Sequence, residues 1–97
     1  MIMYNPPHPG EFITEIYLAP YGISTRTLAS RLDVAPSTVS RMLKGTSRVT
    51  PDMALRLSKA LGRSPQSWLA MQDAHDLWVA KQHLDLSGVS RLELVEA

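Results

Sequence analysis

The sequence contains no cysteine, which excludes disulfides, thiolate nucleophiles and thiolate metal ligands and predicts a reducing, cytoplasmic setting. Long apolar runs are lacking too: none approaches the ~20 residues of a membrane-spanning helix. The opening residues MIMYNPPHPGEF do not form a signal peptide. Ninety-seven residues predict one domain.

Catalytic and metal-binding patterns are also missing. There is no glycine-rich phosphate loop, and no serine or threonine has a base and an orienting acid at motif spacing. His75 and His83 stand too far apart to share a metal, and His8 is better placed as a helix cap. We therefore expect no enzymatic activity, cofactor or metal.

Positive charge is concentrated in one part of the chain, although the net charge is only +1. Residues 24–48 carry five basic side chains against Asp33 alone, whereas residues 1–23 and 49–97 each carry more acid than base. Basic side chains concentrated in one segment can form the patch that a phosphate-binding surface requires. The alternative is a solvent-exposed surface that is basic but binds no nucleic acid.

Proline, glycine and capping residues divide the first 83 positions into five predicted helices. The helices are expected from Pro9 until Pro20 and Gly22 end the first, from Ser24 to Leu32, from Ala35 to Lys44, from Thr50 to Leu61, and from Ser64 to about His83. In the first helix, Phe12, Ile13, Ile16 and Tyr17 form an apolar stripe. The fold class is thus an all-α bundle over residues 1–83. Residues 84–97 form a tail with weak strand-like alternation.

The second and third helices have the spacing of a helix-turn-helix. That motif needs a small residue where two short helices cross, apolar residues on both, and a turn of three or four residues. Ala29 is the small residue, and Leu32-Asp33-Val34 forms the turn. The apolar residues are Leu28, Leu32, Val34, Val39 and Met42.

The third helix presents a small, hydroxylic and basic face. At 100° per residue, Val39 and Met42 fall on one side and no carboxylate falls on the other. Such a face suits the major groove of DNA, where Arg41 can form two hydrogen bonds with guanine. Thr25 and Arg26 lie where the preceding helix crosses the backbone, and Lys44 and Arg48 are expected at phosphates. The candidate DNA-binding residues are Thr25, Arg26, Pro36, Ser37, Thr38, Ser40, Arg41, Lys44 and Arg48.

The fifth predicted helix is apolar on more sides than one buried face requires. We expect one tryptophan in the monomer core and part of the other face in a homodimer, with both tryptophans in the core as the alternative. The candidate interface residues are Ala74, Leu77 and Trp78.

The segment LASRLDVAPSTVSRMLKG resembles the helix-turn-helix of the Cro/CI-like (XRE) repressor superfamily. Three flanking motifs narrow the resemblance to HigA-type antitoxins, over residues 6–83. They are His8-Pro9-Gly10-Glu11, the stretch from Thr50 to Leu57, and the pattern Ser64-Pro65…Trp68-Leu69…Gln72…Asp76-Leu77-Trp78.

The resemblance implies a homodimeric antitoxin that represses its own operon at a palindromic operator and neutralises a small RelE-like ribonuclease toxin. It places the DNA-reading positions at Pro36, Ser37, Thr38, Ser40 and Arg41. Two positions depart from the family pattern: Asp33 replaces the usual glycine of the turn, and Ala35 replaces a serine or threonine cap. A stand-alone regulator without a toxin and a protein-interaction module that has lost DNA binding remain the alternatives.

Overall fold

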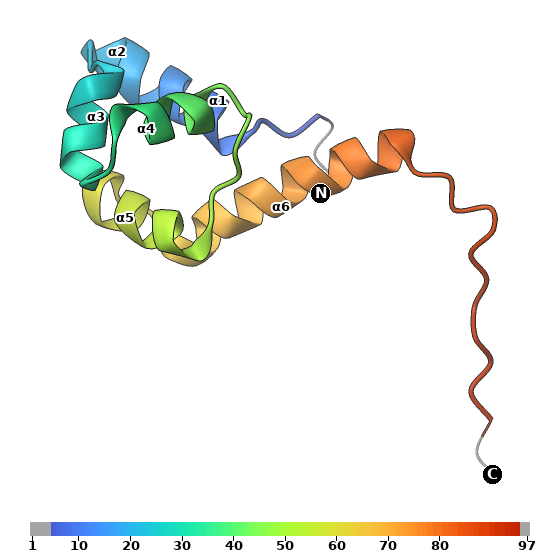
Figure 1. The fold of residues 1–97 in the computed structure, drawn as a ribbon. Helices are drawn as coiled ribbons and strands as arrows, with labels where there is room; N and C mark the ends of the chain where they lie inside the picture. Colours follow the sequence, from blue (N-terminus) through green and yellow to red (C-terminus); the bar gives the residue numbers. More distant parts are fainter. Residues whose placement is uncertain (1–4, 96–97) are drawn as a thin grey trace.

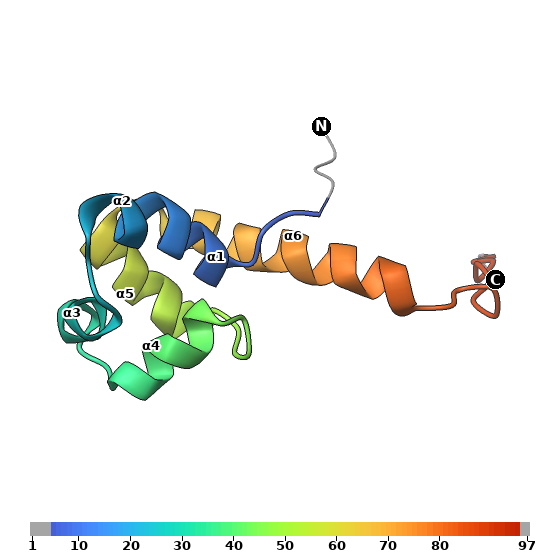
Figure 2. The same ribbon diagram turned by 90° about the horizontal axis from the view of Figure 1, so that it is seen from above.

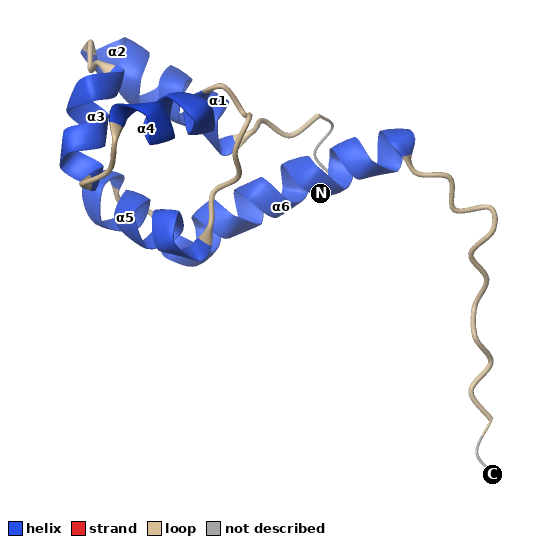
Figure 3. Cartoon of the chain, in the orientation of Figure 1, coloured by secondary structure: helices blue, strands red, loops and turns tan. Residues whose placement is uncertain are grey.

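The computed structural model describes residues 5–95 and contains helices but no strand within that range (Figures 1 and 3). Its elements are α1 (Pro9–Ile13), η1 (Thr14–Leu18), α2 (Ala19–Tyr21), α3 (Thr25–Leu32), α4 (Pro36–Leu43), α5 (Pro51–Leu61) and α6 (Pro65–His83). Because α1, η1 and α2 follow one another without a break, the described chain forms five helices. The predicted all-α class is confirmed.

Most helices begin directly after the capping residues that the sequence predicts. A side chain at the residue before the helix accepts a backbone N–H of the first turn, which satisfies a donor that the helix itself cannot pair. The capping side chains are those of His8, Ser24, Thr50 and Ser64, at 2.9, 3.1, 3.2 and 3.1 Å. The helix α4 differs, because Ala35 precedes it and supplies no such bond.

Gly22 ends the first helix as predicted, in a left-handed conformation with φ 64°, but Pro20 lies inside the helix and does not end it. The residues Thr14–Leu18 form a π-helical turn, and the helix continues through Pro20 to Tyr21. Proline lacks an N–H and its ring collides with a preceding carbonyl, so a wider turn accommodates it within the helix. A π-helical turn holds one residue more than an α-helical turn, so the residues that follow it face a different direction. Ile16, predicted to be inside, is 49% exposed, whereas Leu18 is 6% exposed.

The core lies where α1, α3, α4, α5 and α6 meet. Trp68 on α6 is the largest fully buried side chain. Its ring stands edge-on to Phe12 at a centroid distance of 6.0 Å, and its indole N–H donates to the Gly62 carbonyl at 3.0 Å. The residues expected on the inner face of α3 (Leu28, Ala29, Leu32) are buried. Of those expected on the inner face of α5, Met53, Ala54 and Leu57 are buried and Leu61 is partly buried against the core.

The second half of α6 and the tail extend beyond the bundle (Figures 1 and 2). The described chain consequently measures 59 × 28 × 27 Å. Residues 84–95 follow an irregular, exposed path, so the strand-like alternation does not produce a strand there. Residues 1–4 and 96–97, at the ends of the predicted domain and tail, lie outside the described residues. No helix within residues 5–95 has the length and apolarity needed to cross a membrane.

Candidate nucleic-acid interface

The helices α3 and α4 form the predicted helix-turn-helix and project from a side of the bundle that α6 does not cover (Figure 2). The turn begins at Asp33, which adopts a left-handed conformation with φ 57° and ψ 48°. There the N–H of Val34 donates to the Ala29 carbonyl at 3.1 Å and that of Asp33 to Ser30 at 3.2 Å. These two bonds close α3 in the manner of a Schellman motif and reverse the chain toward α4. Ala29 itself is 1% exposed, as expected for the small residue of the crossing.

One face of α4 is buried and the opposite face is open. Val39 and Met42 lie in the core, and Leu43 packs against it. On the outer side, Pro36, Ser37, Arg41 and Lys44 are exposed, while Thr38 and Ser40 are partly buried. The helix contains no acidic residue, and within the described chain Arg41 and Lys44 form no ion pair. Two cations and several hydroxyls are therefore available to a ligand on this face.

The remaining DNA-binding candidates lie at different places. Thr25 is the first residue of α3 and Arg26 beside it is exposed, so both stand at the start of the motif. Arg48, by contrast, is paired with carboxylates of the chain itself, although its side chain is 63% exposed. Its guanidinium lies 2.9 Å from the Asp76 carboxylate and 3.5 Å from that of Asp73, both on α6. These ion pairs partly neutralise the positive charge of Arg48 and weaken its attraction for a phosphate.

Gly10 supports the back of α4, a contact that sequence reasoning missed. A Cβ at Gly10 would lie 2.2 Å from the Met42 carbonyl oxygen and 2.7 Å from the Leu43 Cα. Only glycine permits α1 and α4 to approach so closely. A glycine in the first turn of a helix, where alanine has the better propensity, was the available signal.

The loop that follows α4 is fastened to α6. Gly45 has φ 78°, and the N–H of Thr46 donates to the Arg41 carbonyl at 3.0 Å, which closes the helix. Further on, the N–H of Val49 donates to the buried Gln72 side chain at 2.8 Å, and the Gln72 amide donates to Asp76 at 3.0 Å. The family pattern contains Gln72, and the structure shows its physical role: it satisfies a buried backbone donor far away in the sequence.

His8 caps α1 as predicted, with Nδ1 accepting the Gly10 N–H at 2.9 Å. Its ring is buried and stands edge-on to His75 at a centroid distance of 5.3 Å. Burial, and after it the proximity of His75, lowers the pKa of His8 below 6.5, although Asp76 and Glu11 act in the opposite direction. The neutral ring is therefore the form that keeps the cap. Within residues 5–95, no three histidine or carboxylate side chains lie close enough together to hold a metal ion.

The proposed dimer residues lie on the part of α6 beyond the core. Trp68 fills the monomer core, which confirms the expected place of one tryptophan. Trp78 is partly buried, Ala74 is exposed, and Leu77 is 63% exposed. Among the described residues, Ala74 and Leu77 on this projecting part of α6 are therefore mostly uncovered, and Trp78 is covered in part.

Two short crossing helices, a tight left-handed turn and an open second helix define a helix-turn-helix protein. The helix-turn-helix family matches residues 15–68, and the chain belongs to that family. It is 44% identical over 92 residues to an uncharacterized HTH-type transcriptional regulator, YddM of Escherichia coli K12, covering 95% of this chain and 97% of YddM.

Among solved structures, the chain is similar to antitoxins of the HigA family. An addiction module antidote protein of the HigA family from Coxiella burnetii is 38% identical, with a TM-score of 0.76 over 82% of this chain and 86% of that one. The Pseudomonas aeruginosa antitoxin HigA, solved with the higBA promoter, is 30% identical, with a TM-score of 0.79 over 92% and 99%. The resemblance to HigA-type antitoxins is confirmed.

Proposed function

We propose that the protein is a sequence-specific DNA-binding repressor that reads the major groove with α4. The carrying observation is the outer face of α4, which is exposed, contains no acid and leaves Arg41 and Lys44 unpaired within the described chain. Cations and hydroxyls on the open face of a helix match a groove lined by phosphates and base edges. A relative of the same fold was solved with promoter DNA, which supports this use of the surface.

The residues have different roles in this proposal. Arg41 reads a base, with Ser37, Thr38 and Ser40 close enough along α4 to contact bases or phosphates. Pro36 begins the helix, and its missing N–H costs nothing at that position. Thr25, Arg26 and Lys44 contact phosphates on either side, and Arg48 contributes only if it leaves its carboxylates on α6.

Two substitutions test the reading role. Arg41→Ala should weaken binding to the DNA upstream of the protein's own gene by about 1–3 kcal/mol and relax the preference at one base pair. Lys44→Ala should weaken binding evenly across sequences and reduce the salt slope by about one unit. Fluorescence anisotropy with single-base variants of the site measures both effects. Equal behaviour of the two variants, with specificity intact, would refute the assignment of α4 to the groove.

We infer further that two copies bind a palindromic operator. A helix as short as α4 reads about four or five base pairs, too few for affinities of about 10⁻⁸–10⁻¹¹ M. Two-fold symmetry adds a second reading helix, and the apolar Ala74, Leu77 and Trp78 of α6 provide the joining surface. Leu77→Glu should separate the dimer and lower operator affinity while the monomer stays helical, since Leu77 is mostly exposed. Light scattering that finds a monomeric wild type at micromolar concentration would contradict the dimer.

We also propose that the protein represses its own operon and neutralises a small RelE-like ribonuclease toxin, as an antitoxin does. Its likeness to a HigA-family antidote protein supports this part. Co-expression with the neighbouring gene is the test: the pair should be tolerated and should purify together, whereas the neighbour alone should arrest growth. A neighbour that is harmless alone would leave a stand-alone regulator.

A further inference from the structure

The turn of the helix-turn-helix has aspartate at a position that glycine fits better. Asp33 stands at the left-handed position after α3, with φ 57°. Glycine adopts this conformation without steric cost, whereas a residue with a Cβ does so less readily. In addition, α4 starts without a side-chain cap at Ala35. Neither end of the link between α3 and α4 is therefore stabilised by its own side chains in the usual way.

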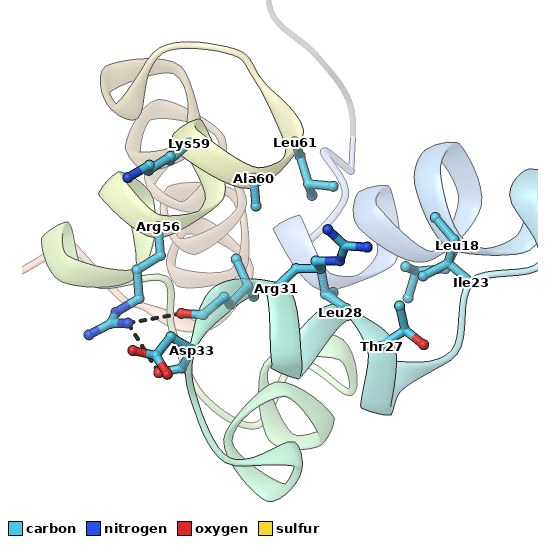
Figure 4. A pocket seen from close by; sticks show the side chains of 11 residues that line it. Leu18, Ile23, Thr27, Leu28, Arg31, Asp33, Arg56, Lys59, Ala60 and Leu61 are labelled. Carbon is cyan, nitrogen blue, oxygen red and sulfur yellow. Dashed lines mark hydrogen bonds between the residues drawn. The ribbon is translucent and has the colours of Figure 1, made fainter.

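A side chain from α5 holds this turn. Arg56 extends across one end of the groove between α3 and α5, and its Nη1 donates to the Leu32 carbonyl at 2.8 Å and to the Asp33 carbonyl at 3.2 Å (Figure 4). These oxygens lie at the end of α3, where carbonyls lack helical partners and the helix dipole is negative. A cation there satisfies two acceptors and offsets the partial negative charge.

The guanidinium is itself held in place. Its Nε lies 3.4 Å from the Asp52 carboxylate one turn earlier on α5. The helix α5 is anchored by Met53, Ala54 and Leu57 in the core. Arg56 therefore connects the turn to a rigid part of the bundle. Lysine has a single ammonium group and cannot contact the carboxylate and both carbonyls in the same planar arrangement.

We propose that Arg56 is a positioning residue for the reading helix: by holding the Leu32 and Asp33 carbonyls it maintains the left-handed turn that a glycine would otherwise provide, and so sets the orientation of α4 on DNA. This inference rests on the proposed function. Arg56 lies on α5, outside the helix-turn-helix, and in this proposal it affects operator binding without contacting DNA.

The test compares Arg56→Met with a control, Lys59→Met, in the full-length chain. Both changes remove one positive charge from α5, but Lys59 makes no hydrogen bond to the turn within the described residues. Arg56→Met should lower operator affinity roughly tenfold or more, the scale of losing charge-assisted hydrogen bonds, while Lys59→Met stays within about threefold of wild type. The salt slope should be unchanged in Arg56→Met, because no phosphate contact is lost.

Rescue by glycine distinguishes positioning from general destabilisation. Asp33→Gly removes the conformational penalty, so the double variant Arg56→Met/Asp33→Gly should recover to within about threefold of wild-type affinity. A double variant as weak as Arg56→Met, a single variant that binds like wild type, or a salt slope reduced by one unit would each overturn the proposal.

Hydrogen exchange gives a measurement that does not depend on DNA. The amides of Asp33 and Val34 are bonded to Ser30 and Ala29, and they should lose protection in Arg56→Met but not in Lys59→Met. Unchanged protection would overturn the role of Arg56 in the turn. If the wild type failed to bind its upstream DNA, the proposed function would fall, and the exchange data would still decide whether Arg56 holds the turn.

Discussion

Replacing Gly10 by alanine should move α4, the proposed reading helix, without changing any of its side chains. The added Cβ would lie 2.2 Å from the Met42 carbonyl oxygen and 2.8 Å from that of Leu43, whereas ordinary contact begins at 3.4 Å. Because the atoms it meets are backbone, no side chain can rotate away. The helices α1 and α4 must instead separate by about 1 Å, which is a large change for a close-packed interface.

The size of the effect follows from two opposing contributions. Overpacking of this kind costs about 1–3 kcal/mol. Because the Cβ would meet backbone at 2.2 Å, the cost lies in the upper part of that range, about 2–3 kcal/mol. Alanine offsets up to about 1 kcal/mol of this, because it has the better helix propensity. We therefore expect a net loss of about 1–2 kcal/mol, which lowers the melting temperature by roughly 5–15 °C in a domain of this size. Operator affinity should fall further, by about tenfold or more, since Arg41 moves relative to its base.

Circular dichroism melting and fluorescence anisotropy on the same preparation measure the two quantities. Gly88→Ala is the matched control, because a Cβ at Gly88 meets nothing within 4 Å. It should change neither the melting temperature nor the affinity. A Gly10→Ala variant that also changed neither would show that α1 and α4 do not approach as closely as argued.

Three further predictions concern the supports of the motif. Ala29→Leu adds volume where α3 and α4 meet and should lower the free energy of unfolding by about 1–3 kcal/mol. The variant should remain folded but lose operator binding, and a melting temperature and operator affinity equal to those of wild type would show that the two helices do not cross at Ala29. The lowered pKa of His8 means that the unfolded chain binds its proton more readily, so this contribution to stability is complete above about pH 6.5 and is lost as the pH falls below it. Thermal melts at several pH values should show a smaller loss in His8→Asn, whose amide can still cap α1; equal losses would exclude His8 as the source. Gln72→Leu leaves the Val49 N–H buried without an acceptor and should cost about 1–3 kcal/mol in chemical denaturation, and a variant as stable as wild type would show that the bond contributes little.

Local sequence was sufficient for the starts of the helices and for the two faces of α4, but not for the π-helical turn of the first helix. A helix begins where a side chain or a proline meets the needs of its first turn, and these residues are adjacent in the chain, as at Ser24 and Thr50. The buried and open sides of α4 follow from helical periodicity, because Val39 and Met42 recur at one turn while no acid occupies the other side. Whether α4 contacts DNA through the named residues stays a prediction.

Contacts between distant segments could be learned only from the tertiary structure. In the sequence, Arg48 is one more cation of the basic region, whereas in the structure it is paired with Asp73 and Asp76 on α6. Arg56 carries no local signal of its role, and Gly10 is locally only an unusual residue for a helix, because the groups that both residues meet belong to other elements. Propensity and periodicity describe neighbours along the chain, whereas packing brings together residues whose separation in sequence is arbitrary. The starts of the helices and the faces of α4 were therefore determined locally, whereas the contacts that hold α4 in place were determined by the fold.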